Sequence, residues 1–366
     1  MTVPYGLMAD LHLHGWSAFS STTTDGQNSR LVGLLCEIRR CCAETHAAGG
    51  KTVVLAGDIF HVRGAVVPSV FNAVRDCLRD CANEFGTYFT IIPGNHDLEG
   101  KLSTRLSSAV TALEGSTTTV VNRSHYFGKE FRVVMVPWIE NIDALKAEIE
   151  SLGTGDMDKF FRKGTDLILH APIDGVIKGL PDHGLSPEYL AALGFKRVFA
   201  GHYHNHKRFD GDVYSIGALA HHTWSDIGSK AGYLLVYPDR VDWRKSHLPE
   251  FIELSQLTDV EPEDLPLVVD GNFIRVKVEA SKSKDVEAAR QELLDMGAKA
   301  VIVQALPKPP AREGSAIRPT VSAGGSLEVS VSNFVSAMFG GAVDGQSAAV
   351  TKAAFDVLAA VDAAGE

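Results

Sequence analysis

The sequence of 366 residues lacks a long apolar segment, and no run approaches the roughly 18–20 residues that a membrane-spanning helix needs. Its first residues, MTVPYGLMADLHLHG, show no basic stretch followed by an apolar one, which is the pattern of a secretory leader. We therefore expect a cytoplasmic protein without membrane attachment.

Cysteine is scarce, and its spacing contains no CxxC pair. The five cysteines are Cys36, Cys41, Cys42, Cys77 and Cys81. An odd number argues against a closed disulfide framework. Cys77 and Cys81 lie four residues apart on one face of a predicted helix, and we interpret them as small buried apolar side chains.

Positive charge is also in short supply, because 35 lysines and arginines face 45 aspartates and glutamates, for a formal net charge of −10. Attraction to phosphates supplies most of the non-specific affinity of proteins for nucleic acid. The overall charge therefore does not favour nucleic-acid binding, although a local basic strip or a basic partner protein is compatible with it.

What the chain does contain is typical of a folded protein, with 45% hydrophobic and 22% charged residues. Eight short apolar segments bounded by turn signals predict β-strands of about 5–8 residues each. They are YGLMADL, KTVVLAGDIF, YFTIIPG, FRVVMVPW, DLILHAP, KRVFAGHYH, DVYSIG and AGYLLVY. Most are apolar on both faces, as strands covered on each side must be. Residues 29–46 and 69–85 carry helical periodicity between the strands.

This alternation predicts an α/β layered domain over residues 1–254. An acidic, proline-bearing stretch at 255–270 is typical of a linker. A strand–helix–strand pattern at 271–306 predicts a small second domain. Residues 307–346 form a Pro/Gly-rich connector, and the alanine-rich amphipathic spacing within 347–366 predicts a C-terminal helix.

Polar side chains follow five of the predicted strands at the point where each strand ends. They are Asp10, His12, Asp58, Asn95, His170, His202 and His204. Taken singly, each has an ordinary explanation as a turn residue or a structural histidine. Ligands gather at the carboxyl ends of strands in open α/β sheets, so five such strand ends in succession favour a shared site.

A mixed set of carboxylate, imidazole and amide ligands suits Mn²⁺, Fe²⁺ or Zn²⁺ better than an all-oxygen Mg²⁺ or Ca²⁺ site. So many ligands suit two ions, about 3.5–4 Å apart, that share one carboxylate. Such a pair activates a water and clamps a phosphoryl oxygen, so the implied reaction is hydrolysis of a phosphate ester. We expect two divalent ions, with Mn²⁺ first and Fe²⁺, Zn²⁺ or Mg²⁺ as alternatives.

The ordered motifs resemble the five-block signature of the calcineurin-like metallophosphoesterases over about residues 5–240. They read DLH at 10–12, GD at 57–58, GNHD at 94–97, H at 170 and GHYH at 201–204. The resemblance implies a four-layer α/β/β/α sandwich of two central sheets faced by helices, with a small strand–helix–strand cap domain. It also implies that His96 donates a proton or hydrogen bond to the phosphate or leaving oxygen, with Asp97 orienting it.

The same resemblance implies how the metal ligands divide between two ions. One ion would be held by Asp10, His12, Asp58 and His204, and the other by Asp58, Asn95, His170 and His202. Asp58 would therefore bridge the two ions. His96 would not bind metal.

Other segments are similar to the DNA double-strand-break nucleases of the SbcCD type. GDIFHVRGAVVP resembles their second block, which implies that His61 contacts the DNA phosphate. YSIGALAHHTWSDIGSKAGYLLV resembles the segment after their last histidines, although Ala218 stands where they have a serine hydroxyl. The domain at 271–306 resembles their DNA-capping module. DGQNSR, after the first block, is similar to phage or mobile-element members.

This resemblance implies a two-metal DNA exo- or endonuclease subunit of recombination or repair, with an SMC-like ATPase as partner. Homodimerisation through helices beside the site would match those nucleases. The alternative is a phosphodiesterase or phosphatase that acts on small molecules or nucleotides with the same metal site. A closed pocket would favour the alternative, whereas a separate cap favours the nuclease. A non-catalytic scaffold is disfavoured because no ligand is missing.

Overall fold

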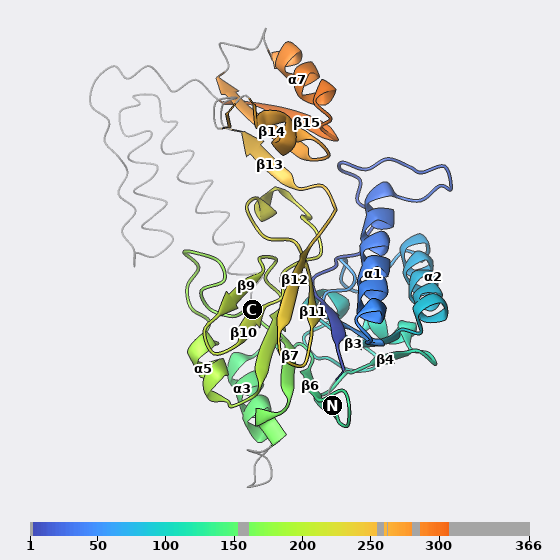
Figure 1. Ribbon diagram of the computed structural model, residues 1–366, viewed down its shortest axis with the longest axis vertical. Coiled ribbons are helices and arrows are strands. Elements are labelled where there is room, and N and C mark those ends of the chain that lie inside the picture. The colour runs from blue at the N-terminus through green and yellow to red at the C-terminus, as the bar shows by residue number, and fades with distance from the viewer. Residues whose placement is uncertain (1–2, 153–160, 255–259, 262, 280–285, 307–366) are drawn as a thin grey trace, which may run out of the picture. The chain divides into compact units, whose positions relative to one another are not determined.

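The computed structural model describes residues 3–152, 161–254, 260–261, 263–279 and 286–306. These residues form two six-stranded sheets, a three-stranded sheet and flanking helices (Figure 1). The connector predicted at 307–346 and the helix predicted at 347–366 lie outside the described residues. Among the helices that the structure describes, none is both long and apolar enough to span a bilayer.

The first sheet has the strand order β12-β11-β1-β2-β3-β4. Its strands are β1 (Tyr5–Met8), β2 (Thr52–Ala56), β3 (Tyr88–Ile92), β4 (Thr118–Val120), β11 (Gly232–Val236) and β12 (Val241–Lys245). Strands β1 to β4 run parallel, whereas β11 pairs antiparallel with β1, and β12 pairs antiparallel with β11. The carboxyl ends of β1, β2 and β3 therefore meet at one rim of the sheet.

The second sheet has the strand order β5-β6-β7-β8-β10-β9. Its strands are β5 (His125–Phe127), β6 (Val133–Val136), β7 (Asp166–His170), β8 (Arg197–Gly201), β9 (Lys207–Phe209) and β10 (Val213–Ser215). The four central strands run parallel, and β5 and β9 close the two edges in antiparallel pairing. The carboxyl ends of β7 and β8 lie next to each other as a result.

Helices cover the outer face of each large sheet. They are α1 (Ser29–Ala47) and α2 (Pro68–Phe85) on the first sheet, and α3 (Ile142–Ser151) and α5 (Pro187–Ala192) on the second. Three short 3₁₀ turns lie in the connecting loops, namely η1 (Asn95–Asp97), η2 (Ala109–Leu113) and η3 (Trp224–Asp226). Separate buried clusters fill the space between the first helix pair and its sheet, between the two sheets, and between the second sheet and its helices. This arrangement confirms the predicted four-layer α/β/β/α sandwich, and Figure 1 shows the two helix pairs on opposite flanks.

The ends of the two long helices follow local sequence signals. The side chain of Asn28 caps α1 by accepting hydrogen bonds from the N–H groups of Arg30 and Leu31. Pro68 occupies the first turn of α2, where a missing N–H costs little. Gly86 ends α2 in a left-handed conformation with φ of 66°, which glycine adopts without strain. Both helices therefore begin and end close to the predicted boundaries.

The small sheet is parallel and has an apolar core of its own. It consists of β13 (Phe251–Leu254), β14 (Phe273–Glu279) and β15 (Ala300–Leu306), with α6 (Leu265–Val269) and α7 (Val286–Asp295) packed against it. The predicted strand–helix–strand unit corresponds to β14, α7 and β15. Strand β13 comes from residues that sequence analysis assigned to the larger domain, and α6 lies within the stretch interpreted as a linker.

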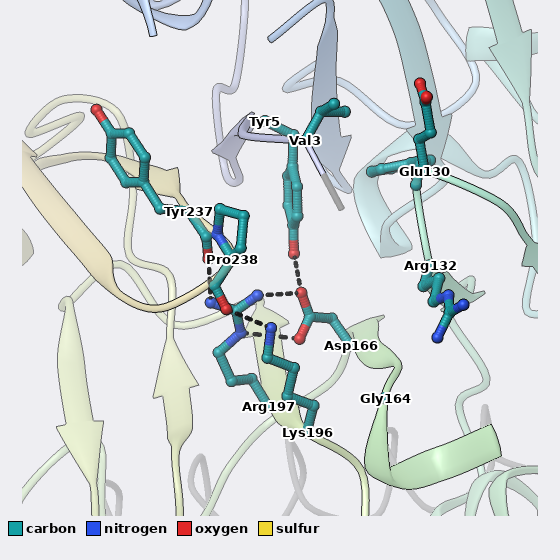
Figure 2. Close-up of a pocket in the computed structure, with 11 residues that line it drawn as sticks. Val3, Tyr5, Glu130, Arg132, Gly164, Asp166, Lys196, Arg197, Tyr237 and Pro238 are labelled. Carbon is teal, nitrogen blue, oxygen red and sulfur yellow. Dashed lines mark hydrogen bonds and ion pairs between the residues drawn. The ribbon is translucent and has the colours of Figure 1, made fainter. Parts of the chain in front are cut away.

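A buried ion pair joins the first residues of β7 and β8 (Figure 2). Arg197 donates two hydrogen bonds to the carboxylate of Asp166, at 2.8 Å and 2.6 Å. The hydroxyl of Tyr5, on β1, donates to the same carboxylate at 2.8 Å and so ties the first sheet to the second. Burial, and then the charge of Asp166, raise the pKa of Tyr5 well above its usual value, so the hydroxyl stays a donor.

Replacing Arg197 with methionine is expected to lower the free energy of unfolding by about 3–5 kcal/mol, because Asp166 would be left buried without its cation. Urea denaturation followed by circular dichroism measures the change. Arg208→Met removes an exposed arginine that also pairs with an aspartate, and it should leave stability almost unchanged. Equal stability of the two variants would contradict the structural role of the buried pair.

Candidate metal centre

Four of the predicted site residues take strained backbone conformations at the strand ends. Asp10, His12 and Asp58 have φ of 51°, 45° and 52°, and His202 has φ of 112°. Such values are rare outside glycine, cost about 1–3 kcal/mol each and concentrate at functional sites. The N–H of Asp10 bonds to the Gly57 carbonyl at 3.0 Å, and the N–H of His12 bonds to the Asp58 carbonyl at 2.9 Å. The ends of β1 and β2 are thus held as one unit.

Two glycines allow the loops of the site to approach closely. A Cβ atom at Gly94 would lie 2.2 Å from Oδ1 of Asp58. A Cβ atom at Gly57, where φ is 92°, would lie 2.2 Å from Nδ1 of His170. Neither position has room for a side chain, which explains why glycine directly precedes Asp58 and Asn95 in the sequence.

Asp10, His12 and His204 form one candidate ligand group, with ligand atoms that all lie within 4.8 Å of one another. The Nε2 atoms of His12 and His204 are 3.2 Å apart, and Nε2 of His12 lies 3.8 Å from Oδ2 of Asp58. Both carboxylate oxygens of Asp10 accept the N–H of His202 at 3.0 Å. Asp10, from the first sheet, therefore also anchors a loop of the second sheet.

Asp58, His170 and His202 form another candidate ligand group, again within 4.8 Å. Nε2 of His170 lies 3.4 Å from Oδ2 of Asp58, and Nδ1 of His202 lies 3.1 Å from Oδ1 of Asn95. Because Asp58 also approaches His12, it stands between the two groups. The structure thus brings together all the ligands that sequence analysis selected.

The donor geometry fits divalent metal ions. Ligands about 2.0–2.2 Å from a shared ion lie about 3.0–3.5 Å from one another, and the closest N–N and N–O separations at this site have that length. The buried Nε2 of His170 has no hydrogen-bond partner among the described residues. Its Nδ1 lies 2.8 Å from the carbonyl of Ala56, which can only accept, so the neutral ring donates there and keeps a lone pair on Nε2 for a metal.

The charges of the site also suit metal binding. Burial alone would raise the pKa of Asp58, but the positive charge that His170 carries when protonated, 3.4 Å away, outweighs burial and holds that pKa below its usual range. Burial would lower the pKa of His170, yet Asp58 raises it to about 9. Burial lowers the pKa of His202 to about 3. Asp58 as a carboxylate and His202 as a neutral ring are the forms that ligate metals, and an ion at His170 would displace a proton.

His96 and His61 lie beside the candidate ligands. Nδ1 of His96 donates to the carbonyl of His61 at 2.7 Å, and the two rings stack with centroids 5.7 Å apart. Nδ1 of His61 is 3.3 Å from Nδ1 of His12, and the ring centroid of His96 is 4.8 Å from that of His12, so both imidazoles border the first ligand group. The bond to His61 fixes the ring of His96 and leaves its Nε2 for other partners.

Asp97 does not hold the ring of His96, which corrects the role that the resemblance implied. Its carboxylate accepts the backbone N–H groups of Ile59, Phe60 and Gly94, at 3.2 Å, 2.9 Å and 2.9 Å. The fully buried Asp97 therefore fixes the loops that follow β2 and β3 relative to each other. Nδ1 of His96 is bonded instead to the carbonyl of His61.

Comparison of the sequence with known protein families matches residues 3–206 to the family described as calcineurin-like phosphoesterase. The match spans more than half of the chain and includes every candidate metal ligand. The chain belongs to the calcineurin-like phosphoesterase family. It is accordingly a metal-dependent hydrolase of phosphoester bonds, and its two groups of aspartate and histidine agree with the two divalent ions that the family typically binds.

Two solved structures resemble this phosphoesterase at low sequence identity. A dimetal phosphatase from Danio rerio is 13% identical, with a TM-score of 0.37, and the match covers 67% of this chain and 96% of that chain. Nuclease MPE from Pseudomonas putida is 18% identical, with a TM-score of 0.30, and the match covers 66% of this chain and 87% of that chain. The search of curated proteins found no match.

Asp226 supports the metal centre of this phosphoesterase, although sequence analysis gave it no role. Its Oδ1 accepts a hydrogen bond from Nδ1 of His204 at 2.7 Å, and its Oδ2 accepts the N–H groups of His222 and Thr223 at 2.8 Å and 2.9 Å. A carboxylate behind a metal-binding imidazole fixes its tautomer and orientation. The sequence signal here is TWSD, a capping-box pattern that predicts a turn and says nothing of a metal.

Replacing Asp226 with asparagine is expected to weaken the affinity of the phosphoesterase for Mn²⁺ by about 10–100-fold, because a neutral amide no longer strengthens His204 as a ligand. Calorimetric titration of the metal-free protein with Mn²⁺ measures the affinity. Asp182→Asn makes the same chemical change at an exposed position and serves as control. An unchanged affinity in Asp226→Asn would contradict the support of His204.

Arg30 and two adjacent histidines connect the small sheet to the metal centre. Arg30 donates from Nη2 to the carbonyls of His221 and His222, at 3.2 Å and 2.9 Å. Nδ1 of His221 accepts the N–H of Phe251, the first residue of β13, at 3.0 Å. Nε2 of His222 donates to the carbonyl of Asp10 at 2.9 Å. Neighbouring residues of one segment thus contact the small sheet on one side and a candidate metal ligand on the other.

Proposed function

We propose that this phosphoesterase is a DNA nuclease of the SbcCD type, an exo- or endonuclease subunit that acts in recombination or repair. The observation that carries the proposal is the small sheet of β13, β14 and β15, which has its own apolar core. Through Phe251 this sheet contacts His221, whose neighbour His222 bonds to the candidate metal ligand Asp10. A small-molecule esterase of the same family would close a pocket over its metals with inserted loops. A separate module beside the metals supports a long substrate such as a DNA duplex.

Two divalent ions fit the candidate centre, and Mn²⁺ is the proposed metal. Asp10, His12, Asp58 and His204 would hold one ion, and Asp58, Asn95, His170 and His202 the other. When bound, such a pair lowers the pKa of a water molecule and clamps the phosphoryl oxygens. Asp58 is the proposed bridge because it lies 3.8 Å from Nε2 of His12 and 3.4 Å from Nε2 of His170.

His96 is the proposed proton donor to the leaving oxygen. Its Nδ1–H is held by the carbonyl of His61, so a protonated Nε2 is the atom that transfers the proton. The ring of His61 packs against Trp16, with centroids 4.4 Å apart, and we propose that it contacts the DNA phosphate. Burial, and then His96, lower the pKa of His61 to about 4, so at neutral pH it would contact the phosphate as a neutral donor.

An SMC-like ATPase is the proposed partner. The chain carries a net charge of −10, and a basic partner would supply the attraction to the DNA backbone that this chain lacks overall. We also propose a homodimer, which would present two metal centres to a pair of DNA strands.

The test compares two substrates in the presence of Mn²⁺, namely end-labelled linear duplex DNA and a chromogenic phosphodiester. The proposed function predicts degradation of the duplex that EDTA abolishes. Hydrolysis of the small ester alone, with the duplex intact even after an SMC-like ATPase is added, would overturn the nuclease in favour of a small-molecule or nucleotide phosphodiesterase. Inactivity on both substrates would contradict the metal centre itself.

A further inference from the structure

A cavity of about 610 Å³ lies between the first turn of α1, the segment that contains His222, and the small sheet. Its volume falls within the range of ordinary ligand pockets. Ser29 and Arg30 line it from α1, and Phe273 and Lys299 line it from the small sheet. The cavity is distinct from the metal centre, but His222 borders both.

The cavity is cationic in an acidic protein. Arg30 and Lys299 line it, and its described lining residues include no aspartate or glutamate. Helix α1 has no acidic residue in its first turn, so the partial positive charge at its N-terminus is not offset there. Together these charges favour an anion in the cavity.

Hydrogen-bond donors remain for such an anion. Three N–H groups of Arg30 bond to main-chain carbonyls, which leaves its Nε–H and one Nη1–H for a ligand. The hydroxyl of Ser29 accepts the N–H of Ser21 at 2.9 Å and keeps its own proton to donate. Lys299 is exposed, so its ammonium is accessible from the solvent.

We propose that this cavity binds a nucleotide, through its phosphate and its adjoining nucleoside. The phosphate would accept hydrogen bonds from Arg30, Ser29 and Lys299. Phe273 would offer apolar surface to the base. The nucleotide is either free or one unit of a nucleic-acid strand. The choice of a nucleotide over another organic phosphate rests on the proposed function.

Binding is tested in EDTA, so that no metal ion contributes. The probes are deoxyadenosine monophosphate, a fluorescent single-stranded hexanucleotide and inorganic phosphate, followed by calorimetry or fluorescence anisotropy. We expect a nucleotide probe to bind at least about tenfold more tightly than inorganic phosphate. Equal affinity of the two nucleotide probes would indicate a site for a free nucleotide, and tighter binding of the hexanucleotide would indicate a strand. Absence of nucleotide binding to the wild-type chain overturns the proposal.

Two variants place a negative charge in the cavity. Lys299→Glu and Ser29→Asp should each weaken nucleotide binding by about tenfold or more. Ser29→Asp also places a carboxylate at the N-terminus of α1, which stabilises a helix, so lost binding there would not reflect unfolding. Lys163→Glu reverses an exposed charge away from the cavity and serves as control. Equal weakening by this control overturns the proposal.

Hydrolysis of the chromogenic phosphodiester tests whether nucleotide binding in the cavity is independent of catalysis at the metal centre. With Mn²⁺ present, Lys299→Glu should hydrolyse the chromogenic phosphodiester at the wild-type rate, because Lys299 belongs to neither ligand group. A failure of the nuclease assay leaves the binding result in EDTA intact, and a failure of binding leaves the hydrolysis result intact. Loss of small-ester hydrolysis in Lys299→Glu would contradict the separation of the cavity from the metal centre.

Discussion

Replacing Asp58 with asparagine is expected to empty both metal positions and to lower phosphodiester hydrolysis by at least about 10⁴-fold. The carboxylate approaches His12 and His170 from its Oδ2 and accepts the N–H of His96 at 2.8 Å on its Oδ1. A neutral amide cannot bridge two cations as a carboxylate does, and its NH₂ group would meet imidazole nitrogens that should bind metal. Metal content per chain by plasma mass spectrometry, together with turnover, measures the effect.

Asp143→Asn is the matched control for this experiment, because Asp143 is exposed at the start of α3. It should retain both ions and wild-type turnover. Thermal unfolding of both variants shows whether the fold survives. If Asp58→Asn kept both ions at full occupancy, the bridging role of Asp58 would be wrong.

Replacing His96 with asparagine is expected to leave the metal content intact and to lower turnover by about 10²–10⁴-fold, the usual contribution of a general acid. The reason is that His96 is the proposed proton donor, while the proposed metal ligands are other residues, although the side chains of His12, His61 and His96 also lie close enough together to hold an ion. Its position depends on the bond from Nδ1 to the carbonyl of His61. Metal analysis and steady-state hydrolysis of a phosphodiester with a poor leaving group measure both quantities.

Two esters whose leaving groups differ in their need for a proton test whether His96 acts as a general acid. A nitrophenolate leaving group needs no proton, so His96→Asn should lose much less activity on that ester than on an alkyl ester. His183→Asn, at an exposed loop position, provides the control for the substitution itself. Loss of the metal ions from His96→Asn, or an equal loss of activity on both esters, would contradict the assignment of His96 as an acid.

The large sheets were predictable because their central strands are short apolar segments between turn signals. Edge strands gave no such signal. Strand β12 reads VDWRK, and its partly solvated position at the edge of the first sheet allows charged residues that a central strand would exclude. Strand β13 lies among the residues that the sequence pattern placed in the larger domain, because its pairing with β14 is made across intervening residues and leaves no local pattern.

The candidate ligands were predictable because each one follows an apolar strand, and the topology then brings parallel strand ends to one rim. The supporting residues were not. Asp226 reaches His204 only through the fold, and His222 meets Asp10 from a distant part of the chain. The role expected for Asp97 came from the family resemblance, and the sequence holds no signal that its side chain bonds to the backbone of two loops.

The carboxylate of Asp97 has a kinetic consequence for these loops. It accepts the N–H groups of Ile59 and Phe60, after β2, together with that of Gly94, after β3. Breaking one of these bonds by local fluctuation leaves the others in place, so neither loop opens alone. The three amide protons should therefore exchange with solvent deuterium in a single cooperative event. Asp58 lies within the loop after β2. The time for which the hydrogen bonds of Asp97 keep the two loops closed would therefore also set how long a bound ion keeps Asp58 as its bridging ligand.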